Sequence, residues 1–107
     1  MDFSDDNVGT PYDRSKTLAE KAAWKFVEEL PEDEKFELCC VNPGLILGTP
    51  LVKCKFSSAD FIKMLVMRET PGTPAITIPL VDVIDVAQAH LNCITIDEAA
   101  NKRFVLC

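Results

Sequence analysis

The sequence predicts an α/β fold built on a parallel sheet, and two observations support this. Three stretches with helical periodicity alternate with short apolar stretches of strand length. The apolar stretches 36–41 and 104–106 have the pattern of strands buried on both faces, which is typical of parallel sheets covered by helices on each side. Such strands need neighbours that this chain does not contain, so we expect it to be part of a larger fold.

The first helix is predicted from Pro11 to Leu30. Thr10 is the expected N-cap, Pro11 suits the first helical position, and Asp13 stands three residues after the cap, as in a capping box. At the helical spacing, one set of side chains falls within an arc of roughly 140°, which we expect to be buried. Its members are Tyr12, Lys16, Ala19, Ala22, Ala23, Phe26, Val27 and Leu30.

The next stretches alternate between strand and loop. We expect a strand over 36–41, ended by Asn42-Pro43-Gly44. Residues 45–52 are apolar but contain Gly48 and Pro50, which favours a loop.

A second helix is expected from Ser57 or Ser58 to about Arg68, with Phe61, Ile62, Leu65 and Val66 as its inner face. Short strands are expected over 75–79 and 80–83. Asp85 is the expected cap of a third helix, from Val86 to about Asp97, and the chain closes with the strand 104–106.

Tyr12 and Lys16 form the most informative pair in the sequence. A lysine is normally placed on the wet side of a helix, yet Lys16 lies on the predicted buried face. At spacing i, i+4 its ammonium can approach the phenol of Tyr12 and favour the ionised form of that phenol, which then serves as an acid or base near neutral pH. The spacing alone also allows a plain alternative, in which Tyr12 packs on a neighbour and Lys16 extends to solvent.

Composition excludes several classes of partner. The formal net charge of −6 provides no basic surface, so we expect neither a nucleic-acid nor a membrane partner. There is no apolar stretch of about 20 residues and the first residues are acidic, so a cytoplasmic protein is expected.

The five cysteines contain no C-x-x-C pair and have only His90 as an imidazole companion, which predicts neither a metal site nor a disulfide framework. Cys39 and Cys40 are adjacent and should point to opposite faces of a strand. We therefore expect reduced cysteines that act mostly as small hydrophobic residues.

Three segments together carry a resemblance to a known family. They are YDRSKTLAEKAAW at 12–24, VNPGLILG at 41–48 and VDVIDVAQAH at 81–90. The chain resembles the extended short-chain dehydrogenase/reductase superfamily, most closely its dihydroflavonol reductase-like branch, which includes cinnamoyl-CoA reductases, within the NAD-dependent epimerase-dehydratase group. The resemblance implies that residues 1–107 are part of a doubly wound, Rossmann-like sheet, on the C-terminal side of the glycine-rich half that the chain lacks.

The resemblance also implies roles for individual residues. Tyr12 would protonate the substrate carbonyl, and Lys16 would hold the cofactor ribose while favouring the ionised phenol. Pro43, Gly44 and Leu45 would line the nicotinamide. Ser57 or Ser58 would either reach the cofactor phosphate or simply cap the next helix. Asp85 and His90 belong to the resemblance, with capping and packing as their expected roles.

Two family features are missing from the sequence. It has no G-x-x-G-x-x-G turn to hold the cofactor pyrophosphate, and no residue can be matched to the family's catalytic serine or threonine. Thr49 also stands between Gly48 and Pro50, where many relatives read Gly-Pro directly. We therefore expect the chain by itself to be inactive or nearly so.

The predicted function is part of an NAD(P)-dependent oxidoreductase that reduces a ketone or aldehyde to an alcohol by hydride transfer. NADP is the expected cofactor, with NAD as the alternative, and the partner is a small carbonyl compound. Other readings remain open: a relative of nucleotide-sugar epimerases and dehydratases or of hydroxysteroid dehydrogenases, and a non-catalytic remnant or interaction module of the same fold.

Overall fold

Helix α1, Pro11–Glu29, begins where the sequence predicts. The computed structural model describes residues 9–52, 57–69, 71–72, 75 and 77–107. Thr10 Oγ1 accepts a hydrogen bond from the Asp13 backbone N–H at 3.3 Å, and Asp13 Oδ2 accepts one from the Thr10 N–H at 2.7 Å. These two bonds complete the capping box. The Asp13 carboxylate accepts hydrogen bonds from the Thr10 N–H and from the Thr10 hydroxyl, and these hold the pKa of Asp13 below its ordinary value.

The strands form two parallel pairs. Strand β1, Cys40–Pro43, pairs with β4, Arg103–Leu106, in a register that sets Cys40 opposite Arg103. Strand β2, Leu45–Leu47, pairs with β3, Leu80–Asp82. Between β1 and β2 the chain passes from one pair to the other at Gly44, so this residue connects the two sheets.

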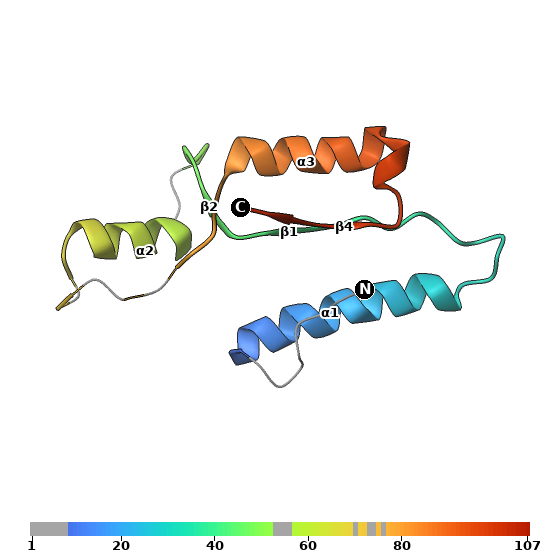
Figure 1. Cartoon of the computed structure of the whole chain (residues 1–107), viewed down its shortest axis with the longest axis horizontal. Helices are drawn as coiled ribbons and strands as arrows, with labels where there is room; N and C mark the ends of the chain where they lie inside the picture. The colour runs from blue at the N-terminus through green and yellow to red at the C-terminus, as the bar shows by residue number, and fades with distance from the viewer. Residues whose placement is uncertain (1–8, 53–56, 70, 73–74, 76) are drawn as a thin grey trace.

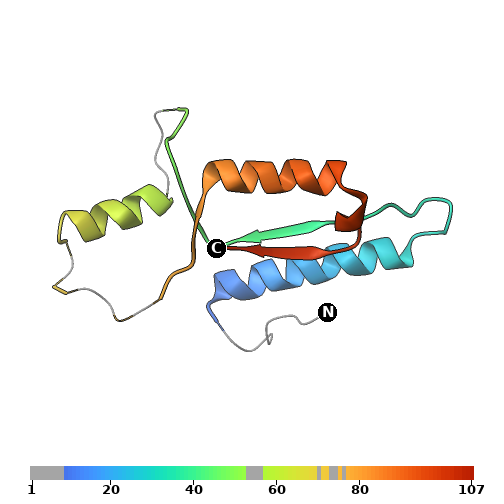
Figure 2. The ribbon, with the colours of Figure 1, turned by 45° about the horizontal axis from the view of Figure 1, so that its top comes forward.

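Helices cover both faces of the β1–β4 pair. Helix α3, Val83–Thr95, lies on one face and α1 lies on the other (Figures 1 and 2). Helix α2, Ser57–Val66, lies to one side of these three layers, and a short 3₁₀ turn, Asp97–Ala99, leads from α3 into β4. This layering, with both strand pairs parallel, confirms the predicted doubly wound α/β architecture.

The predictions for residues 36–41 and 45–52 were partly wrong. Residues 36–39 are not in a strand, because β1 starts only at Cys40, where the partner strand β4 also starts; Phe36 is 52% exposed. Residues 45–47, predicted to be a loop, form β2, because pairing with β3 outweighs the nearby Gly48 and Pro50.

The strand predicted over 75–79 is absent at its described residues, 75 and 77–79, and the following strand is β3. Helix α3 is capped by Asp82, whose Oδ1 accepts a hydrogen bond from the Ile84 N–H at 2.7 Å, and not by Asp85. Asp85 lies in the first turn, where a carboxylate still interacts favourably with the helix dipole.

The structure leaves much of its apolar surface uncovered. Its accessible surface is 8684 Å², whereas a compact monomer of this mass exposes about 5,900 Å². Among the described residues only Val86 and Ala99 are buried, with 8% and 7% of their surface exposed. The molecule therefore buries less surface than a compact monomer of its mass, and each two-stranded sheet leaves its outer edges unpaired among the described residues.

Helix α1 presents a different face to the sheet from the one predicted. Its half-buried residues include Thr17, Glu20, Trp24 and Val27, while Phe26 is 60% exposed. The buried face is therefore turned by roughly a quarter of the helix circumference. The prediction failed because Glu20, a charged residue outside the predicted arc, is half-buried.

Glu20 points inward because it has a partner on β4. Arg103 donates to both of its carboxylate oxygens, from Nε at 2.8 Å and from Nη2 at 3.0 Å. The side chains are only 11% (Glu20) and 27% (Arg103) exposed, and Trp24 Nε1 donates a further bond to Glu20 at 3.3 Å. This bidentate ion pair holds α1 against the sheet.

We expect Glu20→Gln to destabilise the protein by about 1–3 kcal/mol, because Arg103 loses a charged partner in a half-buried position. Arg103 holds the pKa of Glu20 below its ordinary 4.5, so this stabilisation is present above pH 4.5 and is lost as the pH falls through the lowered value. Urea unfolding as a function of pH measures both effects. Glu29→Gln is the control, since the Lys25–Glu29 pair is 3.5 Å apart and exposed, and should cost less than about 0.5 kcal/mol.

Candidate active site

Tyr12 and Lys16 lie together on the first turns of α1. The Lys16 ammonium is 5.4 Å from the centre of the Tyr12 ring, within the range of a cation–π contact. The capping box and Pro11 fix the start of the helix, and the Ser15 hydroxyl donates to the Tyr12 carbonyl oxygen at 2.7 Å. The i, i+4 spacing therefore brings the phenol and the ammonium together as predicted.

The predicted burial of this pair is wrong. Tyr12 is 66% exposed and Lys16 is also exposed. The quarter-turn rotation of α1 carries their face away from the β1–β4 pair, because Glu20 and Trp24 occupy the side toward the sheet. Both polar groups are consequently accessible to a ligand.

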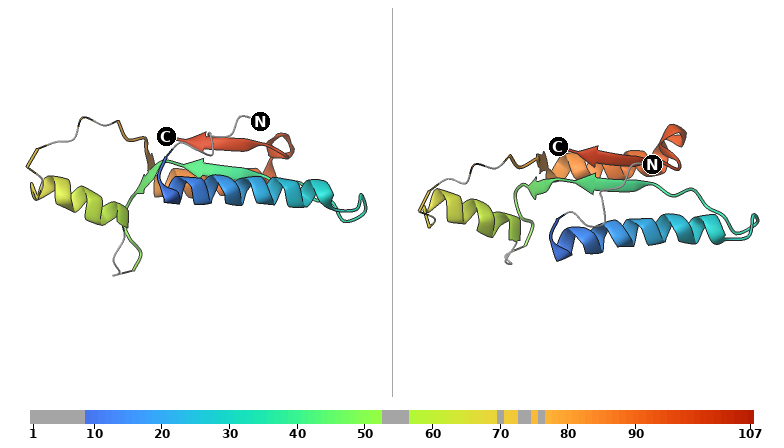
Figure 3. Two further views of the ribbon diagram at one scale, coloured as in Figure 1. Left: turned by 90° about the horizontal axis from the view of Figure 1, so that it is seen from below. Right: turned by 60° about the horizontal axis from the view of Figure 1, so that its bottom comes forward.

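The pair lies at the end of the molecule where β1 and β4 finish. The N-terminal end of α1, the end of β1 and the chain terminus after β4 lie toward the same end of the molecule along its long axis (Figures 1 to 3). In open parallel sheets, ligands bind outside the carboxyl ends of the strands. This position makes Tyr12 and Lys16 the strongest candidates for a functional site.

Pro43, Gly44 and Leu45 occupy the junction between β1 and β2. The Gly44 N–H donates to the Leu106 carbonyl oxygen at 2.9 Å, and the Leu45 N–H donates to the Pro79 carbonyl oxygen at 2.8 Å. A Cβ on Gly44 would lie 2.5 Å from that same Pro79 oxygen. The neighbouring backbone therefore requires glycine at position 44.

Ser57 and Ser58 begin helix α2. The Ser57 side chain and residues 53–56 lie outside the described part of the structure, and Ser58 is half-buried. Helix α2 lies beyond the end of the β1–β4 pair toward which the N-terminal end of α1 points (Figure 1). Contact of either serine with a phosphate stays a prediction.

Sequence reasoning missed Glu20 and Arg103, which position α1. No local signal identifies them, since the two residues are 83 positions apart. Asn42, directly before Pro43, buries its Nδ2 without a hydrogen-bond partner among the described residues.

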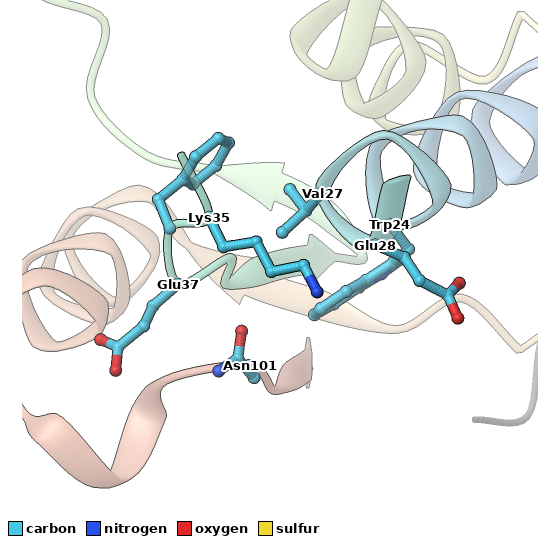
Figure 4. A pocket seen from close by; sticks show the side chains of 7 residues that line it. Trp24, Val27, Glu28, Lys35, Glu37 and Asn101 are labelled. Carbon is cyan, nitrogen blue, oxygen red and sulfur yellow. The ribbon is translucent and has the colours of Figure 1, made fainter. Parts of the chain in front are cut away.

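One hollow of the molecule lies away from the candidate site. It has a volume of about 610 Å³ and lies between the C-terminal half of α1 and the segment before β1, where Trp24, Lys35 and Asn101 line it (Figure 4). Neither Tyr12 nor Lys16 contributes to its lining. The candidate site is instead an open surface at the other end of α1.

His90, the remaining candidate residue, makes a contact within its own helix. His90 Nδ1 lies 2.8 Å from the Val86 carbonyl oxygen, one helical turn back. No cluster of three or more potential metal ligands occurs among the described residues. Within the same residues, no helix has the length and apolar character needed to span a membrane.

The fold and the site together define a class: part of a doubly wound α/β sheet with a Tyr-x-x-x-Lys helix at the carboxyl ends of its strands. No protein-family model matches the chain. Individual proteins do. The chain is 34% identical, over 94% of its length, to a putative uncharacterized oxidoreductase of Saccharomyces cerevisiae, and 35% identical, over 89%, to the NADPH-dependent methylglyoxal reductase GRE2 of the same yeast.

Plant enzymes and solved structures extend the comparison. An anthocyanidin reductase of Vitis vinifera is 34% identical over 90% of the chain. The crystal structure of yeast methylglyoxal/isovaleraldehyde reductase Gre2 complexed with NADPH superimposes with a TM-score of 0.72 at 34% identity, over 89% of the chain, and Gre2 from Candida albicans in complex with NADPH gives 0.69 at 33%. In each of these comparisons the chain spans only about 30% of the relative's length.

The chain belongs to the short-chain dehydrogenase/reductase superfamily, and the reductases that it matches confirm the predicted dihydroflavonol reductase-like branch. The matched structures also confirm the Rossmann-like fold class.

Proposed function

We propose that this chain supplies the proton-donating side of an NADPH-dependent reductase site that converts a ketone or aldehyde to an alcohol. The observation that carries the proposal is the exposed Tyr12–Lys16 pair, with 5.4 Å between ammonium and ring centre, at the carboxyl ends of β1 and β4. A phenol and an ammonium held in this way can serve a ligand in two ways, through an acidic proton and through a fixed positive charge.

The two residues have separate roles in the proposal. The Tyr12 hydroxyl donates its proton to the carbonyl oxygen of the substrate as negative charge develops there. The Lys16 ammonium donates hydrogen bonds to the ribose hydroxyls of the cofactor and favours the phenolate that remains after proton transfer. When bound, the nicotinamide would supply the hydride.

The donor set of the described residues fits such a cofactor. Lys16 offers three N–H donors, and Tyr12 offers one O–H donor on the same exposed face. Pro43, Gly44 and Leu45 lie at the same end of the sheet and are proposed to border the nicotinamide, with Ser57 or Ser58 nearer the phosphates. The relatives described as NADPH-dependent, or crystallised with NADPH, support NADP over NAD.

A segment-swapped reductase tests the proposal. This hybrid enzyme is yeast GRE2 in which the region that aligns with the chain, over 101 residues, is replaced by the chain's own residues. We expect it to oxidise NADPH in the presence of methylglyoxal, the substrate in the name of the yeast enzyme. A folded swap that binds NADPH yet shows no activity dependent on Tyr12 would instead favour the non-catalytic interaction module. Activity only on a nucleotide sugar or a hydroxysteroid would favour those relatives.

We expect Lys16→Met in the segment-swapped reductase to weaken NADPH binding by about tenfold or more, because the variant keeps the aliphatic stem but loses charged hydrogen bonds. Fluorescence titration with NADPH measures this effect. Lys25→Met is the matched control, because Lys25 is an exposed lysine on the same helix, paired with Glu29. Equal effects of the two substitutions would contradict the role given to Lys16.

A further inference from the structure

Two cysteines that are far apart in the sequence meet between β1 and α3. Cys39 directly precedes β1, and Cys93 lies near the end of α3, 54 positions further along the chain. Their sulfur atoms are 2.7 Å apart and both residues are half-buried free thiols. The contact therefore connects the segment leading into the sheet with the helix that covers it.

The neighbouring cysteine points the other way. Burial raises the pKa of the Cys40 thiol and the Glu20 carboxylate on α1 raises it further, so this thiol lies on the α1 side of the sheet. The thiol of Cys39 instead meets α3. This agrees with the predicted placement of Cys39 and Cys40 on opposite faces of the strand. Of these two adjacent thiols, the backbone thus selects Cys39 as the partner of Cys93.

The geometry favours a covalent sulfur pair over a metal site. A disulfide bond is about 2.05 Å long, so the two sulfurs need to approach by only about 0.7 Å more. Two thiolates on one tetrahedral zinc ion would instead be about 3.8 Å apart. No group of three metal-binding side chains is found among the described residues, so further ligands for a metal are also missing there.

We propose that Cys39 and Cys93 are a redox-modification site, which forms a reversible disulfide by exchange with a low-molecular-weight disulfide such as glutathione disulfide. One cysteine thiolate attacks a sulfur of the small disulfide, breaks its S–S bond and releases the first small thiolate. The second cysteine, as thiolate, then attacks the protein-bound sulfur of the mixed disulfide and releases the second. The two protein thiol protons end on the two released thiolates, so the protein is oxidised by two electrons and the small disulfide is reduced to two thiols.

The surroundings of Cys39 and Cys93 determine how a small reagent reaches the thiols and how fast the exchange proceeds. Cys93 also lines a hollow of about 440 Å³ between α3 and β4, which gives a small reagent a route to its thiol. Burial raises the pKa of Cys39 to about 11, with smaller contributions from the neighbouring thiols of Cys93 and Cys40. Little Cys39 thiolate is therefore present at neutral pH, and the exchange should be slow there and faster in mildly alkaline buffer.

The oxidised form should be the more stable one. The bond would close a loop between positions 39 and 93 and so restrict the unfolded chain. We expect the melting temperature to rise on the order of 10 °C on oxidation. Dithiothreitol should reverse this rise.

The test follows the pairing of cysteines after equilibration with glutathione disulfide, alkylation of the remaining thiols and tryptic mass spectrometry. Cys39 and Cys40 fall in one tryptic peptide, 36–53, so Cys39→Ser and Cys40→Ser are needed to separate them. We expect the link from this peptide to the Cys93 peptide to persist in Cys40→Ser and to vanish in Cys39→Ser and in Cys93→Ser.

The same reaction carried out on the protein unfolded in urea shows which cysteine pairs form without the folded structure. In an unfolded chain, loop closure favours near pairs such as Cys40 and Cys54 over Cys39 and Cys93 by several-fold. We expect the native protein to reverse this order. Equal distributions in buffer and urea, a link that survives in Cys39→Ser, or separate glutathione adducts on Cys39 and Cys93 would each overturn the proposal.

Discussion

Tyr12→Phe is expected to lower kcat/KM of the segment-swapped reductase by about 10²- to 10⁴-fold, because the substitution removes a single hydroxyl that serves as general acid. The hydroxyl belongs to a side chain that is 66% exposed, so its loss should leave the packing of α1 unchanged. Steady-state kinetics with NADPH and methylglyoxal, measured across a range of pH, give the size of the effect.

Three further measurements make the result decisive. The melting temperature and the NADPH affinity of Tyr12→Phe should match those of the unsubstituted swap, which separates lost chemistry from lost structure. The Tyr12→Phe/Lys16→Met double variant should be little worse in kcat/KM than the poorer single variant once NADPH is saturating, because Lys16 has no phenol left to act on. Near-normal turnover in Tyr12→Phe would return both residues to a structural role.

Gly44→Ala is expected to destabilise the protein by about 3 kcal/mol, at the upper end of the usual cost of overpacking. The added Cβ would lie 2.5 Å from the Pro79 carbonyl oxygen and 2.9 Å from its carbon. Pro79 cannot simply move away, because the same oxygen accepts the Leu45 N–H at 2.8 Å. Relief of the clash therefore breaks the junction between the two strand pairs, and urea unfolding should show this as a lower midpoint.

Gly72→Ala is the matched control for this substitution. A Cβ at Gly72 would have no described heavy atom within 4 Å, and we expect a change of less than about 0.5 kcal/mol. If Gly44→Ala were as mild as Gly72→Ala, the close approach of the Pro79 backbone would not be what requires glycine at position 44.

The sequence by itself determined the features that rest on local interactions. The start of α1 follows from Thr10, Pro11 and Asp13, whose contacts lie within three residues of one another. The approach of Lys16 to Tyr12 follows from the helical repeat alone. The alternation of helices with short apolar strands likewise sufficed for the α/β class, and the three quoted motifs sufficed for the family.

Only the tertiary structure decided the features that depend on distant partners. The start of β1 and the existence of β2 depend on pairing with β4 and β3, which lie 30 or more positions further along the chain. The face that α1 turns to the sheet depends on the pairing of Glu20 with Arg103, 83 positions away, and a hydrophobic pattern cannot anticipate a carboxylate that is buried because it is paired. The need for glycine at position 44 comes from the backbone of Pro79, and the meeting of Cys39 with Cys93 comes from the packing of α3 on β1. In each case a contact between distant residues outweighs a local preference, because the free energy of that contact exists only once the chain has folded.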